Sequence, residues 1–317
     1  MNKHFTKKIA ALGAAAMLCG SLLTGCGGQQ TQDDTLTVVT TVYATYDLAK
    51  QLTADFDTEV SVKLLLTPGG ESHSYEPTPS DVAAIQSCDL FVYIGGTSEQ
   101  WAEKMIASSR TEKANLRMFD SVTLLDEEAV EGMQAEEEEE EEEYDEHIWT
   151  APLNADSMAD ALRAAIGGIV PEEAAKCDAS YAKLHGELTA LDAEAKEIRE
   201  NAKSDTLIFA DRFPFRYFTA AYDWQYYAAF SGCSSDTDAS AATLSFLITK
   251  VQELQIGTVF YLENSSQKIS DAVCTATGAQ AVMLQSGNNV SAEDFAAEKH
   301  YQEIMEENLS AIREAVS

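Results

Sequence analysis

The stretch Leu90-Phe91-Val92-Tyr93-Ile94-Gly95 decides the fold class, because it is a short apolar run that ends at a glycine. A run of this length and composition predicts a strand that is buried on both faces. Helix-like segments lie on either side, at 80–87 and 99–107, and the alternation begins with a strand-like run at 36–41. Strands that alternate with helices favour a parallel sheet covered by helices.

The same alternation resumes after residue 204, and one long helical segment, 171–203, separates the two series. Pro171 suits the first turn of that helix. Its apolar residues step by three and four: Tyr181, Leu184, Leu188, Leu191, Ala195 and Ile198. At ~1.5 Å per residue, this helix would extend for roughly 45 Å, enough to run along two lobes.

We therefore expect an α/β protein of two lobes, each a mainly parallel sheet covered by helices, joined by one long rigid linking helix. The lobes are expected to span 36–170 and 204–317. Ligands of such sheets bind beyond the carboxyl ends of the strands, so the site is expected in the crevice between the lobes.

The first 26 residues have the pattern of an exported lipoprotein. A positive segment with three lysines precedes an uncharged apolar run, 9–23, which is shorter than the ~20 residues of a membrane-spanning helix. The ending Leu23-Thr24-Gly25-Cys26 resembles the bacterial lipobox, in which the cysteine is diacylated and becomes the mature N-terminus. We expect a signal peptide over 1–25, lipid attachment at Cys26 and a flexible tether to residue 35. The alternative is an ordinary signal peptide in which Cys26 is incidental.

The chain is strongly acidic, with 21 Lys and Arg against 53 Asp and Glu. Because the phosphate backbone of nucleic acids demands a positive surface, nucleic acid is not expected as a partner. Beyond the signal region, four well-separated cysteines form no CxxC motif: Cys88, Cys177, Cys233 and Cys274. One disulfide is possible in an exported protein, but the sequence does not assign its pairing.

Residues 126–146 interrupt the first lobe with fourteen acidic residues and no Lys or Arg. Eight consecutive glutamates, 136–143, lie within them. Such a run repels itself, so the sequence predicts an acidic, disordered loop.

Two histidines occupy loops that we expect to face the crevice. His73 follows the turn at 67–70, and His147 follows the acidic segment. Imidazole is a ligand that suits zinc, and a site with fewer than four protein ligands can keep an open position. From the residues alone, metal binding and a surface or capping role both remain open.

Two motifs resemble those of a known family, the zinc and manganese solute-binding proteins of bacterial ABC importers (cluster A-I). The first is Ser72-His73-Ser74-Tyr75-Glu76-Pro77-Thr78-Pro79-Ser80-Asp81, and the second is Asp145-Glu146-His147-Ile148-Trp149-Thr150-Ala151-Pro152-Leu153-Asn154-Ala155. The resemblance covers nearly the whole mature chain, and the acidic loop lies where zinc members carry a charged, often His-rich loop. It implies that His73 and His147 are metal ligands and that the long helix is the family's rigid backbone helix.

The second lobe departs from the common pattern of this family. Its segment 209–218 has no histidine where members carry their third ligand. Asp211 is the nearest acid and the expected replacement; the alternative is that it pairs with Arg212 or Arg216, or caps a helix. The motif 211–217, Asp-Arg-Phe-Pro-Phe-Arg-Tyr, resembles a variant subgroup of the family. Glu263 fits the fourth ligand position, with a solvated loop acid as the alternative.

The resemblance implies an extracytoplasmic lipoprotein, held at the outer face of the cell membrane, that captures a divalent transition metal and delivers it to an ABC permease. Histidines with carboxylates suit Zn²⁺, and carboxylates also suit Mn²⁺; the Irving–Williams order favours zinc. A manganese-binding protein of the same type and a surface adhesin are the alternatives. An enzyme is not expected, because the chain has no HExxH, GxSxG or P-loop motif. We expect a monomer.

Overall fold

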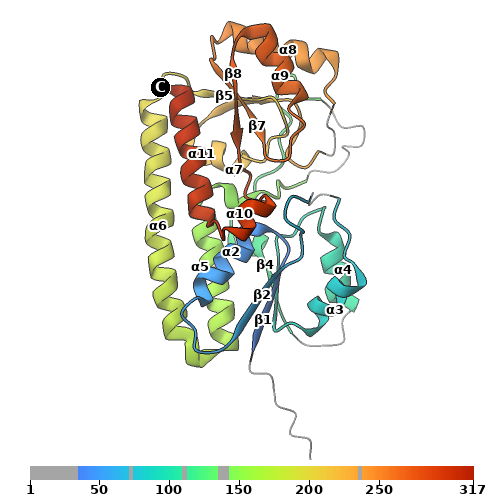
Figure 1. Cartoon of the computed structure of the whole chain (residues 1–317), viewed down its shortest axis with the longest axis vertical. Helices are drawn as coiled ribbons and strands as arrows, with labels where there is room; N and C mark the ends of the chain where they lie inside the picture. The colour runs from blue at the N-terminus through green and yellow to red at the C-terminus, as the bar shows by residue number, and fades with distance from the viewer. Residues whose placement is uncertain (1–34, 71–73, 109–112, 135–142, 235–237) are drawn as a thin grey trace, which may run out of the picture. The chain divides into compact units, whose positions relative to one another are not determined.

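The computed structural model describes residues 35–70, 74–108, 113–134, 143–234 and 238–317. Residues 35–317 form one compact unit, which Figure 1 shows as a ribbon. Its described part contains two four-stranded sheets, and every strand pair in both sheets is parallel. The predicted fold class is confirmed.

The first sheet has the strand order β2-β1-β3-β4. Its strands are β1 Leu36–Thr40, β2 Val60–Leu64, β3 Leu90–Tyr93 and β4 Ala114–Arg117. Helices α2 Tyr43–Thr53, α3 Pro79–Ser87 and α4 Gln100–Ser108 alternate with them. All four residues of β3 are buried, as its unbroken apolar sequence predicts.

The second sheet repeats this arrangement with the order β6-β5-β7-β8. Its strands are β5 Thr206–Phe209, β6 Gln225–Ala228, β7 Thr258–Leu262 and β8 Gln280–Leu284. Helices α7 Arg216–Tyr222, α8 Ala241–Glu253 and α9 Lys268–Thr277 alternate with them. In the first sheet, β2 and β3 lie on opposite sides of β1, and in the second sheet, β6 and β7 lie on opposite sides of β5. The switch points therefore lie between β1 and β3 and between β5 and β7. Ligands of open α/β sheets bind at such points.

Long helices join the two lobes. Helix α5, Pro152–Ile169, leads through a 3₁₀ turn at Pro171–Glu173 into α6, Ala174–Asn201. Helix α6 contacts α2 of the first lobe and α7 of the second. Helix α11, Tyr301–Val316, runs beside it (Figure 1). The predicted long helix is therefore present, and it begins at Ala174 because Pro171 starts a tighter turn first.

A short helix, α10 Ala292–Ala296, precedes α11 and is separate from it. Between the two helices, Glu298 adopts a left-handed backbone with φ of 53°. His300 then caps α11 together with Glu303.

The two ends of the acidic segment are held in place by backbone pairing. Asp126 and Tyr144 form an antiparallel bridge, and the Glu127 amide donates to the Glu143 carbonyl at 2.8 Å. Gln134 then reaches the second lobe, where its amide donates to the Ala229 carbonyl at 3.0 Å. Residues 135–142, including most of the glutamate run, lie outside the described residues, as do the signal region and Cys26.

In the described parts of the chain, no helix has both the length and the apolar character needed to cross a membrane.

Candidate metal centre

His147 lies in the connection between the lobes, just before a 3₁₀ turn at Ile148–Thr150 that leads into α5. Only 2% of its surface is exposed. Gly232, from the second lobe, packs directly on the ring: a Cβ at that position would lie 3.1 Å from both Nδ1 and Cε1 of His147. Both lobes thus enclose the imidazole, although the two residues before it in the sequence, Asp145 and Glu146, are acidic.

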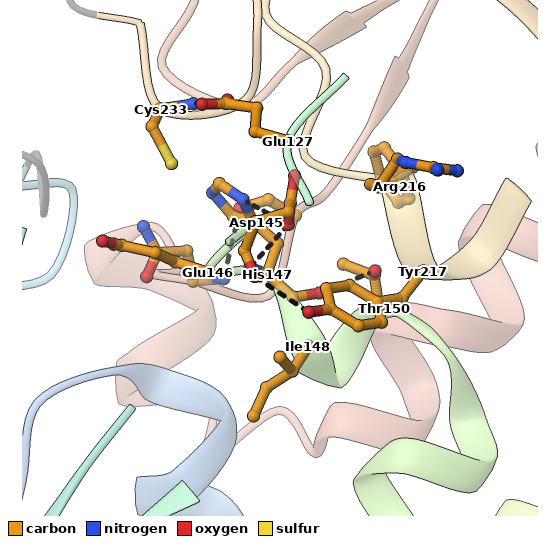
Figure 2. Close-up of polar contacts among 12 residues, drawn as sticks. Glu127, Asp145, Glu146, His147, Ile148, Thr150, Arg216, Tyr217 and Cys233 are labelled. Atoms are coloured by element: carbon orange, nitrogen blue, oxygen red, sulfur yellow. Dashed lines mark hydrogen bonds and ion pairs between the residues drawn. The ribbon is translucent and has the colours of Figure 1, made fainter. Parts of the chain in front are cut away.

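Asp145 orients this imidazole. One oxygen of its buried carboxylate, Oδ1, accepts a hydrogen bond from the His147 amide at 2.8 Å and lies 3.2 Å from the ring Nδ1 (Figure 2). When Nδ1 carries the proton, Nε2 is left with the lone pair that binds a metal, and carboxylate–histidine pairs of this kind are common behind metal ligands. The geometry therefore suits His147 as a ligand through Nε2.

The charges around His147 favour its protonated form. Burial alone would lower the pKa of the imidazole, but Asp145, followed by Glu146 and Glu127, outweighs burial and raises the pKa above its ordinary value. Protons therefore compete with a metal at this side chain at a higher pH than at an ordinary histidine.

The second lobe also fixes the segment that carries Asp145. The Tyr217 hydroxyl, on α7, donates to the Asp145 carbonyl at 3.0 Å and accepts from the Leu125 amide at 3.1 Å. Burial raises the pKa of Tyr217, which keeps this hydroxyl protonated. One tyrosine thus binds both ends of the acidic segment to the second lobe.

Glu263 and His147 line the same cavity. The other residues that line it are Gly70, Arg212, Pro214, Gly232, Leu262, Asn264, Ser286, Asn288 and Asn289. Glu263 follows β7, and its Oε2 accepts from the Ser286 amide at 2.8 Å while its Oε1 accepts from the Ser286 hydroxyl. Burial raises the pKa of the Glu263 carboxyl. Two of the predicted site residues, one from the lobe connection and one from the second switch point, are therefore brought to one cavity.

Asp211 follows β5 and has a different set of contacts. Its Oδ1 accepts from the Arg212 amide at 2.8 Å, and its Oδ2 accepts from the Leu262 amide at 3.1 Å, which ties the ends of β5 and β7 together. Asp211 is absent from the residues that line the cavity of His147 and Glu263. Arg216, one of the alternative partners, pairs with Glu128 at 3.2 Å.

His73 lies outside the described residues, in the segment 71–73. Gly70, the residue before that segment, lines the cavity of His147 and Glu263. Among the residues the structure does describe, no three His, Cys, Asp or Glu side chains gather closely enough to hold a metal ion. The ligand roles of His73, His147, Asp211 and Glu263 stay predictions.

A comparison with protein families now identifies the chain. The model of the family "Zinc-uptake complex component A periplasmic" matches residues 38–315. The chain belongs to this family. The predicted resemblance to the zinc and manganese solute-binding family is thereby confirmed, and the match includes strands of both sheets and the long helix.

Individual relatives agree with this zinc-uptake family. The chain is 30% identical over 312 residues to the zinc-binding lipoprotein AdcA of Streptococcus pneumoniae, covering 97% of this chain but 61% of AdcA. It is 28% identical over 307 residues to the high-affinity zinc uptake system protein ZnuA of Bacillus subtilis, covering 94% of this chain and 95% of the relative. The crystal structure of the Zn(II)-bound ZnuA-like domain of pneumococcal AdcA superposes with a TM-score of 0.74 at 26% identity, covering 89% and 99% of the two chains.

Within this family member, the structure places two acids beside His147 that the sequence pattern did not single out. Glu127 accepts a hydrogen bond from the Cys233 amide at 3.1 Å, and burial raises the pKa of its carboxyl. Glu146 is 7% exposed and accepts from the Ser98 amide at 2.8 Å. Figure 2 shows Glu127, Glu146 and Cys233 around His147. Both glutamates belong to a strongly acidic segment, so their sequence context indicates solvated charge. Only Glu146 carried a signal in the sequence, because it directly precedes His147.

The cysteines outside the signal region are all free thiols: Cys88, Cys177, Cys233 and Cys274. Burial, and then the neighbouring acids Glu146, Glu127 and Asp145, raise the pKa of Cys233 well above its usual value. A thiol is a poor metal ligand until it loses its proton, so this environment disfavours Cys233 as a ligand.

Proposed function

We propose that this protein captures Zn²⁺ outside the cytoplasm and delivers it to the membrane permease of an ABC importer. The observation that carries the proposal is the cavity shared by His147 and Glu263, with His147 oriented by Asp145 at 3.2 Å. Zinc is the transported solute, and the protein performs no covalent chemistry. The zinc-binding names of the relatives support the choice of metal and of process.

The proposed ligands are His73, His147 and Glu263, with Asp211 as the fourth candidate. Nitrogen and oxygen donors of this kind satisfy the coordination of Zn²⁺, and three protein ligands would leave a position for water. Both oxygens of Asp211 already accept a backbone hydrogen bond, so a metal bond would have to use their remaining lone pairs. Manganese is the alternative solute, because carboxylates also suit that ion.

We further propose that a lipid on Cys26 holds the protein at the outer face of the membrane. The lipobox-like ending at residues 23–26 supports this anchor, and the relative AdcA is itself named a lipoprotein. A tethered protein stays near its permease, which raises the local concentration of captured metal there.

Calorimetric titration of residues 27–317 with Zn²⁺ and Mn²⁺ tests the proposal. We expect zinc to bind more tightly than manganese, and we expect His147→Ala to weaken zinc binding at least ~100-fold, because the other ligands cannot replace a buried imidazole. His185→Ala is the matched control, since this exposed histidine on α6 pairs with Asp156 at 2.9 Å. Binding of neither metal more tightly than about micromolar would overturn the proposed function.

A further inference from the structure

The loop after β3, residues 94–99, is closed on itself by a buried carboxylate. Glu99 is 8% exposed, and its Oε2 accepts hydrogen bonds from the Ile94 amide at 2.7 Å and the Gly95 amide at 2.9 Å. Two backbone bonds from one side chain fix the shape of a short loop. This loop lies at the switch point of the first sheet, where β1 and β3 are neighbours.

The same loop also holds a second carboxylate, that of Glu146, by hydrogen bonds. The Ser98 amide donates to Glu146 Oε1 at 2.8 Å, and the Ser98 hydroxyl donates to Oε2. Both oxygens of Glu146 are therefore held by one residue. Glu146 is bonded directly to His147 in the chain.

Position 96 requires glycine, because the loop backbone passes very close to the Glu146 side chain. Gly96 has a φ of 102°, which side chains of L residues rarely adopt, and a Cβ there would lie 2.6 Å from Glu146 Oε1 and 2.8 Å from its Cγ. The backbone can approach Glu146 only because no side chain intervenes. We call Gly96, Ser98 and Glu99 the carboxylate clasp.

The clasp and His147 also face a common space. A second cavity is lined by Thr41, Ser98, Glu99, Glu146 and His147, together with Val42, Leu66, Tyr75, Ile94, Trp101, Trp149 and Asn288. The imidazole therefore lies between this cavity and the one that contains Glu263. Asp145 contacts the ring and the backbone amide of His147, and Ser98 holds the carboxylate of Glu146, the residue directly before it in the chain.

We propose that the carboxylate clasp positions His147 for metal binding by fixing the adjacent Glu146. Gly96, Ser98 and Glu99 are positioning residues in this view, because they act on the metal through His147 without touching it. The inference rests on the proposed function, in which His147 is a ligand. It adds that the first lobe contributes to the site through a loop that supplies no ligand itself.

Ser98→Ala tests the clasp, because it removes the hydroxyl bond to Glu146 and leaves the backbone unchanged. We expect zinc binding to weaken about 10- to 100-fold, as is typical when the support of a ligand is lost. We also expect the visible spectrum of the Co²⁺-loaded protein to change, since that spectrum reports the geometry of the ligands. Ser98→Thr, which restores a hydroxyl, should recover most of the affinity and the spectrum.

Ser240→Ala is the matched control. The Ser240 hydroxyl caps α8 by accepting from the Thr243 amide at 3.1 Å, so its loss should lower the melting temperature without altering zinc affinity or the Co²⁺ spectrum. The proposal for the clasp alone would be overturned if Ser98→Ala kept the wild-type zinc affinity and Co²⁺ spectrum. The same holds if Ser240→Ala lost as much zinc affinity as Ser98→Ala. Failure of the wild-type protein to bind zinc would instead overturn the proposed function on which the clasp rests.

Discussion

Asp145 acts on the candidate ligand His147 in two ways. Its carboxylate faces the Nδ1 of His147 and also holds the His147 amide. The residue therefore controls both the tautomer and the direction of the imidazole. Its charge also raises the pKa of His147. Asp145 therefore favours zinc binding by orienting the imidazole, and it also strengthens the competition from protons at that imidazole.

Asp145→Asn should separate these two effects. Zinc affinity near neutral pH should fall about 10- to 100-fold, because the neutral amide orients the imidazole less well. Affinity is lost as the pH drops through the pKa of His147 in the empty site. Because Asp145 raises that pKa, its neutralisation lowers it, and the loss of affinity should move to lower pH.

Calorimetric titrations between about pH 5 and 8 on the wild-type protein and the Asp145→Asn variant measure both changes; the pH range is chosen around the ordinary histidine pKa of ~6.5. An unchanged pH profile would show that Asp145 does not act on a histidine ligand. His185→Ala again serves as the control, because His185 and its partner Asp156 line neither cavity of His147.

At the scale of elements, the ends of β5 and β7 carry two acids with different surroundings. Glu263 lies in the cavity with His147, whereas Asp211 accepts backbone hydrogen bonds from both strand ends. The strands meet at one point of direct pairing, Phe209 with Phe260. The Asp211 carboxylate therefore extends a short contact between neighbouring strands.

The isosteric pair Glu263→Gln and Asp211→Asn distinguishes a ligand from a structural acid. Glu263→Gln should weaken zinc binding at least ~10-fold and leave stability nearly unchanged, because an amide oxygen still accepts from Ser286. Asp211→Asn should lower the free energy of unfolding by about 1–3 kcal/mol, because its NH₂ group would face one of the two backbone amides.

Calorimetry and thermal unfolding of the two variants check this pair of predictions. An equal loss of zinc affinity in Asp211→Asn, with unchanged stability, would establish Asp211 as a ligand and reject its structural role. The sequence alone allowed either outcome, since it places Asp211 close to two arginines and a helix start.

At the scale of the whole molecule, the acidic segment connects the lobes at its described ends. Tyr217 binds the Asp145 carbonyl and the Leu125 amide, and Gln134 binds Ala229. These contacts lie outside the glutamate run itself. Because helix α6 contacts helices of both lobes, we expect only a small change in lobe arrangement on metal binding.

Replacement of residues 136–142 by serine and glycine, with the length kept, should leave zinc affinity within about threefold. The ends of the segment would still be joined by the Asp126–Tyr144 bridge, and exposed charges are screened beyond ~8 Å at physiological salt. Stopped-flow measurement should show slower zinc association at low salt, because the acidic run no longer attracts cations. A large loss of equilibrium affinity would show that the run supplies ligands.

The α/β class, the two sheets, the long helix and the two histidine motifs could be predicted from the sequence. These features depend on local periodicity and on short runs of residues, which are visible along the chain. The parallel order of the strands followed because alternating strands and helices leave few other arrangements.

Which acids lie beside His147 could not be predicted from the sequence, because it depends on the tertiary structure. Glu127 and Glu146 belong to the same acidic segment as exposed glutamates, yet the fold buries Glu146 and partly buries Glu127 beside His147, and it supplies donors from Ser98 and Cys233. Glu263 meets His147 in one cavity because two lobes pack together. Burial and hydrogen bonding between distant segments set the chemistry of a carboxylate, and neither is contained in its neighbours along the chain.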